Sequence, residues 1–246
     1  MSSEISIGII GASGRLGRSI AALALANPAF RVGGAFAHGA SPSLHRDLGM
    51  LLGLRPLGLT LTSDLGATPL DLYIDVSLAP AHTVQTVLDL KRPLVIGSTG
   101  LSPEDFIQLR NASKTIPLFY TANFSLGMAL LCKLTREAAR LFHPQADIDL
   151  IETHHKQKKD APSGSALALA AIVQESHPLH KTPPIHAIRS GKTIGEHELR
   201  FNTIEEQLIL SHQAHSRDAF ASGALAAARF LIGKPAGFYT MDDLLL

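Results

Sequence analysis

Cysteine is nearly absent from this sequence: Cys132 is the only one among 246 residues. A lone cysteine excludes an internal disulfide and any metal cluster held by several thiolates. It lies in the apolar segment GMALLCKLTREAARL, where we expect a small, buried thiol. No apolar run reaches the roughly 18 residues that a membrane-spanning helix needs. The start, MSSEISIGII, lacks the charged segment and cleavage site of a signal peptide, so we expect a reducing, cytoplasmic location.

A strong excess of charge is also absent. The chain has 22 Lys and Arg residues against 21 Asp and Glu residues, which gives a formal net charge of +1. Such a balance provides no general attraction to nucleic acid or to an anionic membrane surface, so neither is expected as a partner. Hydrophobic residues make up 46% of the chain, which is enough to bury a proper core in one or two domains. Any positive field must therefore be local.

Short apolar segments alternate with helical ones over the first half of the chain. This alternation is typical of a parallel sheet wound on both faces by helices. Ser102 and Pro103 mark the start of one helix, as N-cap and first helical residue. The predicted strands are 5–10, 31–37, 70–77, 93–100 and 116–123, and the predicted helices begin after residue 11 and cover 81–90 and 102–113.

The order of elements changes after Asn123. Three strands follow one another without intervening helices, which indicates a second domain of α+β type. A last helix, 220–233, is expected to pack back on the first domain. In this second part the predicted helices are 125–142 and 164–176, and the predicted strands are 147–155, 185–190, 196–203 and 206–214.

The segment GASGRLGR, residues 11–18, follows the first strand and opens a helix. Gly11, Gly14 and Gly17 allow the backbone to approach a pyrophosphate that sits on the helix N-terminus. Arg15 and Arg18 add positive charge beside this turn. The sequence therefore predicts an α/β fold with a Rossmann-type, doubly wound parallel sheet, joined to a second α+β domain with a mostly antiparallel or mixed sheet. The dinucleotide-binding domain is expected to comprise 1–123 and 214–246, and the substrate-binding and oligomerisation domain 124–213.

Two absences refine the choice of cofactor and reaction. A carboxylate usually binds the adenosine ribose at the end of the second strand, but here Ala37 and His38 stand there. His38 and the nearby arginines can accommodate a 2′-phosphate, which favours NADPH slightly and leaves NADH open. Short-chain dehydrogenases need Tyr-x-x-x-Lys, and none of Tyr73, Tyr120 and Tyr239 has a lysine four positions on. That mechanism is excluded.

The densest positive segment is ETHHKQKKDAPSGSAL, residues 152–167. A hydride delivered to a carbon–carbon or carbon–nitrogen double bond leaves negative charge that a proton must quench, and histidine is suited to donate it. His154 and His155 are adjacent at the predicted end of a strand and point to opposite faces, so at most one of them is expected to donate. Lys158 can reach the same pocket. Adjacent histidines do not readily chelate one ion, so no metal site is predicted.

The same segment continues into a helix start. Pro162 interrupts the preceding structure, Ser163 is suited to cap a helix, and the helix proceeds from Gly164. The backbone N–H groups of Gly164 and Ser165, together with the Ser165 hydroxyl, can bind an anion. Combined with two histidines and three lysines, this arrangement predicts a site for a carboxylate.

These residues resemble the 4-hydroxy-tetrahydrodipicolinate reductase (dihydrodipicolinate reductase) family of the diaminopimelate route to lysine. The block HH-x-x-K-x-DAPSG-[ST]-A is highly specific to the family, whereas the glycine turn is not. The matching segments occur in the family's order and cover most of the chain. They are GASGRLGR, YIDVS, VIGSTG, TANFSLGM, ETHHKQKKDAPSGSALA, GEHELRF, SHQAHSRDAFASGALAAARFL and GFYTMDDLL.

The resemblance implies that a reduced nicotinamide transfers hydride to a cyclic dicarboxylate, which loses its hydroxyl as water to give tetrahydrodipicolinate. It implies that His154 is the proton donor and acceptor and Lys158 a second proton donor. It also implies a homotetramer built through the sheet of the second domain. The implied substrate-binding residues are His155, Ser163, Gly164 and Ser165. The implied cofactor-lining residues are Gly11, Ala12, Ser13, Gly14, Arg15, Leu16, Gly97, Ser98, Thr99, Thr121, Ala122, Asn123 and Phe124.

The sequence departs from the family pattern at two places. Ala37 replaces the acid that binds the ribose, and the segment 176–187 is shorter than usual. Two other functions remain open. One is a different two-domain NAD(P)-dependent dehydrogenase acting on an amino or imino acid. The other is a nucleotide-sensing regulatory protein without an active site. The intact His154, Lys158 and 163–165 argue against this alternative, and so does the lack of a basic DNA-reading helix.

Overall fold

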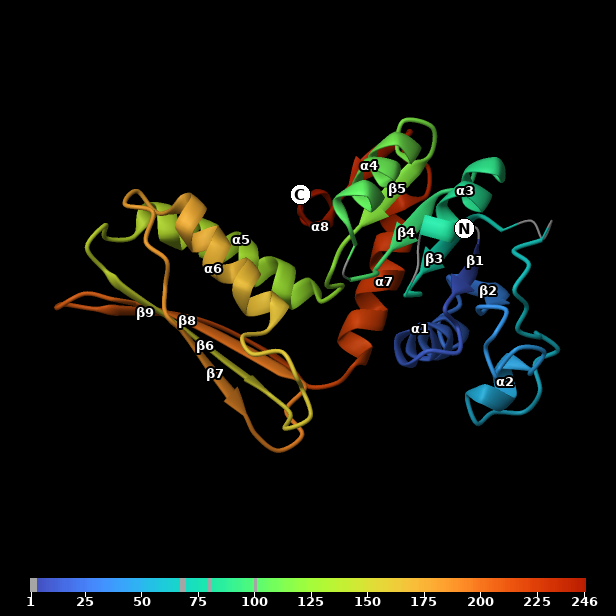
Figure 1. Cartoon of the computed structure of the whole chain (residues 1–246), viewed down its shortest axis with the longest axis horizontal. Helices are drawn as coiled ribbons and strands as arrows, with labels where there is room; N and C mark the ends of the chain where they lie inside the picture. Colours follow the sequence, from blue (N-terminus) through green and yellow to red (C-terminus); the bar gives the residue numbers. More distant parts are fainter. Residues whose placement is uncertain (1–3, 67–69, 79–80, 100) are drawn as a thin grey trace. The chain divides into compact units, whose positions relative to one another are not determined.

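The computed structural model describes residues 4–66, 70–78, 81–99 and 101–246 (Figure 1). Gly100, at the end of the predicted segment 93–100, lies outside these residues, as do the first three. The chain divides into two compact units, Met1–Phe124 with Phe220–Leu246, and Ser125–Ala219. We describe each unit by itself.

The first unit contains a six-stranded sheet in the order β10-β5-β4-β3-β1-β2, with every neighbouring pair parallel. The predicted doubly wound parallel sheet is therefore confirmed. The third, fourth and fifth predicted strands are shorter than expected, and β10, α2 and α8 were not predicted. The elements are β1 (Ile5–Ile10), α1 (Arg15–Leu25), β2 (Phe30–Phe36), α2 (Leu48–Leu51), β3 (Leu72–Asp75), α3 (Ala81–Asp89), β4 (Leu94–Ile96), α4 (Pro103–Ala112), β5 (Pro117–Tyr120), α7 (Asp218–Leu231), β10 (Gly237–Tyr239) and α8 (Met241–Leu244).

The central strands of this sheet are almost continuously apolar because helices cover both of their faces. On one face, Val87 of α3 and Leu109 of α4 join Leu94 and Leu118 of the strands in one buried cluster. The strand order changes direction between β1 and its neighbours β2 and β3. In open parallel sheets such a switch point lies beside the ligand, at the carboxyl ends of the strands.

Local helix signals were predicted correctly. Ser102 caps α4, where its Oγ accepts from the backbone N–H of Asp105 at 3.1 Å and its own N–H donates to the Asp105 carboxylate at 2.8 Å. Pro103 takes the first helical position, where no backbone donor is needed. Ser163 likewise caps α6, with its Oγ accepting from the N–H of Ala166 at 3.2 Å.

The second unit contains a mixed sheet in the order β7-β6-β8-β9, in which β7 is parallel to β6 and the other pairs are antiparallel. Two helices lie against one face of it (Figure 1). The predicted α+β organisation is thus confirmed. The elements are α5 (Leu126–Leu141), β6 (Asp147–His154), α6 (Gly164–Ser176), β7 (Ile185–Arg189), β8 (Gly195–Asn202) and β9 (Gln207–Ala214).

Alternation along the strands separates the two faces of this sheet. Leu150 of β6 and Leu199 and Phe201 of β8 are fully buried against α5 and α6. Cys132 of α5 packs at the margin of this cluster and is partly exposed, so the expectation of a buried thiol was wrong. The reason is its position beside, not on, the buried stripe of α5. Among the described residues, no helix has the length and apolarity to cross a membrane.

Candidate active site

The glycine turn of the first unit is tight for a clear steric reason. Gly11 has φ of +84°, a conformation that favours glycine. A Cβ at position 17 would lie 2.2 Å from the Gly11 carbonyl oxygen, so only glycine lets α1 start this close to the turn. The N–H of Gly14 donates to the same carbonyl at 2.9 Å. Two of the three glycines are therefore required by packing, before any ligand is considered.

The N-terminus of α1 is suited to an anion. Gly14 occupies the N-cap without a side-chain cap, and no acidic residue lies in the first turn. The N–H groups of that turn and the helix dipole favour a phosphate there. Arg15 and Arg18 are exposed beside it. These features fit a dinucleotide pyrophosphate.

The other predicted cofactor residues lie beyond the carboxyl ends of three strands of the same sheet, β2, β4 and β5. His38 follows β2, is exposed, and accepts from the N–H of Ala40 at 3.2 Å through Nδ1. A Cβ at Gly97, after β4, would lie 2.0 Å from the Phe124 ring, so the loops after β4 and β5 pack directly together. After these strands, Ser98, Thr121 and Phe124 are buried, Gly97 and Asn123 partly buried, and Thr99 and Ala122 exposed.

Ser77 is a candidate that the sequence reasoning missed. Ser77 follows β3 and lies next to the glycine turn. A Cβ at Gly11 would be 3.0 Å from the backbone nitrogen of Ser77. Its Oγ is buried and has no hydrogen-bond partner among the described residues. Ser98 donates to the Ser77 carbonyl at 2.6 Å. A buried hydroxyl without a partner at this edge of the sheet supports the fit to a polar ligand.

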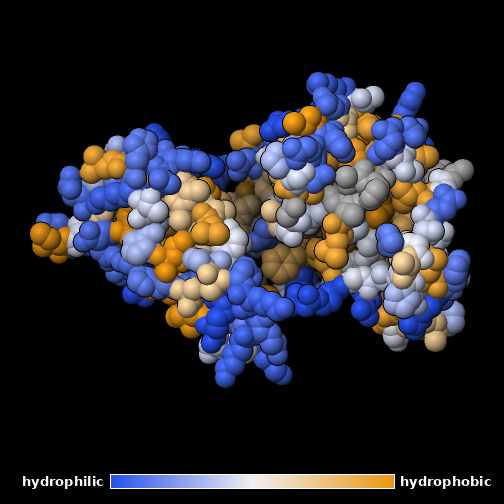
Figure 2. Space-filling model, in the orientation of Figure 1, coloured by the Kyte–Doolittle hydropathy of each residue, from blue (hydrophilic) through white to orange (hydrophobic). Residues whose placement is uncertain are grey.

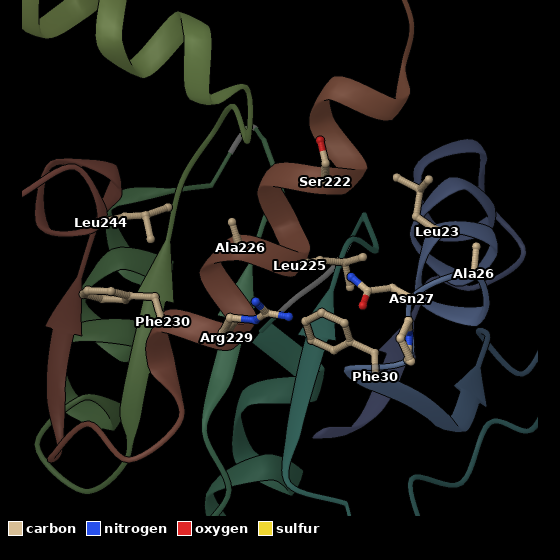
Figure 3. Close-up of a pocket in the computed structure, with 11 residues that line it drawn as sticks. Leu23, Ala26, Asn27, Phe30, Ser222, Leu225, Ala226, Arg229, Phe230 and Leu244 are labelled. Atoms are coloured by element: carbon tan, nitrogen blue, oxygen red, sulfur yellow. The ribbon is translucent and has the colours of Figure 1, made fainter. Parts of the chain in front are cut away.

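The first unit also has a separate pocket of about 780 Å³, away from the glycine turn. It lies between the C-terminal part of α1, the start of β2 and α7, and most of its lining is apolar (Figure 3). The guanidinium of Arg229 lies 5.6 Å from the centre of the Phe30 ring. The labelled residues of this pocket include none of the predicted site.

In the second unit, a buried carboxylate lies beside the predicted proton donor. Glu152 and His154 are two residues apart on β6, so both side chains lie on its buried face. Nδ1 of His154 is hydrogen-bonded to Oε2 of Glu152. Oε1 of Glu152 accepts from Nη2 of Arg189 at 2.7 Å and from the N–H of Ser163 at 3.2 Å. Strands β6 and β7 and the start of α6 therefore meet at one carboxylate.

A second histidine lies against this group. His197 of β8 is paired in register with Glu152, and its ring meets that of His154 edge to face with centroids 5.3 Å apart. Its Nε2 lies 3.3 Å from Oγ of Ser163. The Ser163 hydroxyl is thus engaged by the helix cap and by His197, and only 2% of the residue is exposed.

The remaining predicted residues lie in the loop after β6 and at the start of α6. Nζ of Lys158 forms an ion pair with Asp160 at 2.8 Å. His155, Lys158 and Ser165 are partly exposed, and Gly164 is exposed with no atom within 4 Å of where its Cβ would be. Figure 2 shows strongly hydrophilic side chains where the loops after β6 and β7 project from this unit. The start of α6 is accessible to a ligand.

Burial and neighbouring charges set the protonation of this group. Burial alone raises the pKa of Glu152, but the hydrogen bonds from Arg189 and His154 outweigh it and hold that pKa below its usual range. Burial lowers the pKa of His154, and the positive charges of Lys158 and Arg189 lower it further. The hydrogen bond to Glu152 raises this pKa but does not outweigh burial. Burial, followed by the charge of His154, lowers the pKa of His197 from 6.5 to about 4. In the described part of the chain, no three His, Cys, Asp or Glu side chains are grouped to hold a metal ion.

The sequence reasoning missed Glu152, Arg189 and His197. Glu152 had a usable signal, because residues two apart on a strand share a face and Glu152 precedes His154 by two. Arg189 and His197 had none, because their positions depend on how β7 and β8 align with β6.

The parallel sheet and its glycine turn form a Rossmann-type unit, and the family that matches this unit makes the chain an oxidoreductase that takes NADPH or NADH. Family models described as dihydrodipicolinate reductase, N-terminus and C-terminus, match residues 5–124 and 127–245. The chain belongs to the dihydrodipicolinate reductase family, and the resemblance seen in its motifs is confirmed.

Relatives agree with this assignment, and a solved structure shares the fold. A 4-hydroxy-tetrahydrodipicolinate reductase of Xanthomonas euvesicatoria pv. vesicatoria (strain 85-10) is 40% identical over 247 residues, covering 99% of each chain. One of Caldanaerobacter subterraneus subsp. tengcongensis is 38% identical over 256 residues, covering 96% of each. The dipicolinate-bound dihydrodipicolinate reductase from Paenisporosarcina sp. TG-14 has the same fold, with a TM-score of 0.83 and 22% identity over 99% of this chain and 100% of that one.

The depressed pKa of His197 predicts a loss of stability in acid. Above pH 6.5 the ring is neutral in both states; between 6.5 and about 4 the unfolded chain binds a proton that the folded protein does not, so stability falls as pH falls. At about 1.4 kcal/mol per pH unit the full loss amounts to about 3 kcal/mol. Urea unfolding across this range should show a shallower loss in His197→Gln than in the wild type.

The exposed His143 offers a matched control, because His143→Gln removes a histidine from the surface of the same unit. This control should keep the wild-type slope of unfolding free energy against pH. A His197→Gln slope equal to that of wild type would show that His197 is not buried as a neutral ring.

Proposed function

We propose that this chain reduces 4-hydroxy-tetrahydrodipicolinate to tetrahydrodipicolinate with NADPH or NADH, in diaminopimelate and lysine biosynthesis. The observation that carries the proposal is the buried Glu152–His154 pair beside the accessible start of α6. His154 and the start of α6 belong to the specific block of the second unit, and Glu152 precedes that block by two residues. Relatives that match nearly the whole chain carry this activity in their names. The first unit serves the dinucleotide and the second serves substrate.

The residues of the glycine turn hold the pyrophosphate through the N–H groups at the start of α1, and the loops after β4 and β5 line the nicotinamide. When bound, the nicotinamide supplies a hydride. Ser77 adds a buried hydroxyl at the same edge of the sheet. Ala37 replaces the usual ribose-binding acid, and the neighbouring His38 can accommodate a 2′-phosphate, which favours NADPH slightly and leaves NADH open.

The start of α6 binds one carboxylate of the substrate. Its first N–H groups, at Gly164 and Ser165, point out of the helix and carry the positive end of the dipole. His155 and Lys158 lie on the adjoining loop, where a charge-assisted hydrogen bond to a carboxylate is strong. A dicarboxylate ring is therefore recognised by its charge and oriented by the backbone.

His154 and Lys158 exchange protons with the ring. The net reaction takes up one hydride and one proton and releases one water, so at least one side chain must deliver a proton. Burial lowers the pKa of His154, which makes its protonated ring a stronger acid. Lys158, paired with Asp160, supplies a second proton and a positive charge beside the developing anion.

We also propose a homotetramer assembled through the exposed face of the sheet in the second unit. Ile188 and Ile209 are each 46% exposed on this face, and a hollow of about 470 Å³ crosses it. Sedimentation should give a mass four times that of the 26.2 kDa chain. A species of one chain mass would contradict the assembly.

We also propose a cytoplasmic location, which the use of NADPH or NADH and the single cysteine support. Cell fractionation with a detectable copy of the protein tests it. Recovery with the envelope fraction would contradict it.

Lys158→Ala tests the assignment of proton transfer. We expect kcat to fall about 100-fold or more, since proton transfer by a positioned side chain contributes about that much. The affinity for NADPH should stay unchanged, because Lys158 belongs to the second unit and the glycine turn to the first. The assay follows NADPH consumption with enzymatically generated substrate, and calorimetry gives the nucleotide affinity.

Lys159→Ala is the matched control, because the neighbouring lysine is exposed on the same loop. It should leave kcat near that of the wild type. A Lys158→Ala protein that kept its turnover but lost NADPH would contradict the role given to Lys158.

A further inference from the structure

Resting on the function proposed above, we propose that Glu152 is a positioning residue. Its buried carboxylate fixes His154 in the tautomer that carries hydrogen on Nδ1, so that Nε2 is the nitrogen that exchanges protons with substrate. Arg189 keeps this carboxylate ionised and ties it to the loop that carries Lys158.

The bonding of Glu152 determines the tautomer. An ionised carboxylate only accepts hydrogen bonds, so the hydrogen shared with His154 must come from Nδ1. The other oxygen accepts from Arg189 at 2.7 Å and from the Ser163 N–H at 3.2 Å. With both oxygens bonded and the side chain fully buried, the carboxylate has no freedom to rotate.

The charge on Glu152 is maintained by its surroundings. A buried carboxyl group without partners takes up a proton to avoid the cost of desolvation. Here the guanidinium of Arg189 lies against one oxygen, and together with the His154 bond it outweighs the effect of burial on the pKa of Glu152. The carboxylate therefore stays an acceptor at neutral pH.

Glycine at position 195 leaves room beside Nε2 on the other edge of the His154 ring. A Cβ at position 195 would lie 3.1 Å from Nε2, and the residue there is glycine. With Nδ1 committed to Glu152, Nε2 is the nitrogen left for proton exchange. In a neutral histidine side chain without a partner, the hydrogen favours Nε2. That tautomer would make Nε2 of His154 a donor and leave it unable to accept a proton.

Arg189 extends the arrangement to Lys158. Its Nη2 donates both to Glu152 and, at 2.6 Å, to the carbonyl of Asp160. The side chain of Asp160 in turn holds Lys158 at 2.8 Å. The buried carboxylate of Glu152 therefore positions both candidate proton donors, His154 directly and Lys158 through Arg189 and Asp160.

The charged and titratable groups that face His154 come from four segments. They are Glu152 on its own strand, Lys158 on the following loop, Arg189 on β7 and His197 on β8. Glu152 is the one that raises the pKa of His154, whereas burial and the charges of Lys158 and Arg189 lower it. Removal of the carboxylate charge must therefore lower that pKa further.

The first test reads the tautomer directly, without a reaction. Nitrogen-15 spectra of the histidine rings are recorded at a pH where His154 is neutral, and its signals are assigned by their loss in His154→Gln. The proposal expects hydrogen on Nδ1 in the wild type and a shift towards Nε2 in Glu152→Ala. Hydrogen on Nε2 in the wild-type protein overturns it, whether or not the protein reduces the proposed substrate.

The second test reads catalysis in Glu152→Gln, which keeps the size of the side chain and removes its charge. We expect kcat to fall roughly 10-fold or more, as for partners that orient a functional histidine. The alkaline limb of the kcat profile should move to lower pH, because His154 loses its proton earlier, while KM for NADPH stays the same. Glu152→Asp should restore part of the rate.

Glu137→Gln is the control, since it removes an exposed carboxylate that pairs with Arg140 on α5. It should leave the profile unchanged. A wild-type profile in Glu152→Gln overturns the positioning role while the proposed reaction stands. A wild-type protein without reductase activity refutes the proposed reaction, and the tautomer measurement still decides the role of Glu152.

Discussion

The carboxylate of Glu152 is the point at which three segments of the second unit meet. It accepts from Arg189 of β7, from the N–H of Ser163 at the start of α6, and from His154 two positions along its own strand. A charge buried this deeply costs several kcal/mol unless it is fully paired, so each partner is held in place by the need to satisfy it. The arrangement that orients the chemistry is therefore also one that fixes the local fold.

Under the proposed function, both units bind a negatively charged group at the start of a helix. In the first, a tight glycine turn brings the backbone up to the start of α1, where Gly14 caps without a side chain. In the second, the loop after β6 leads to the start of α6, where Gly164 is exposed. The neighbouring side chains differ. Arginines lie beside the first helix start, where we propose a phosphate, and histidines and Lys158 lie beside the second, where we propose proton transfer.

The sequence predicted what depends on local patterns. Alternating segments indicated both sheets, Ser102 and Ser163 marked helix starts, and Gly17 is explained by a steric contact within its own turn. It did not predict the short strand β10, whose three residues form a strand only because β5 has a free edge. Arg189 and His197 were also missed, because each reaches Glu152 only through strand register, which local pattern does not encode.

In the proposed reaction, His154 is the group that exchanges a proton with the substrate. The most direct measurement is the single-turnover rate of NADPH oxidation by His154→Gln, saturated with both NADPH and the hydroxylated ring. We expect a rate about 100- to 10,000-fold below that of wild type, with NADPH bound as tightly as before. A variant that turns over as fast as the wild type would contradict this role of His154.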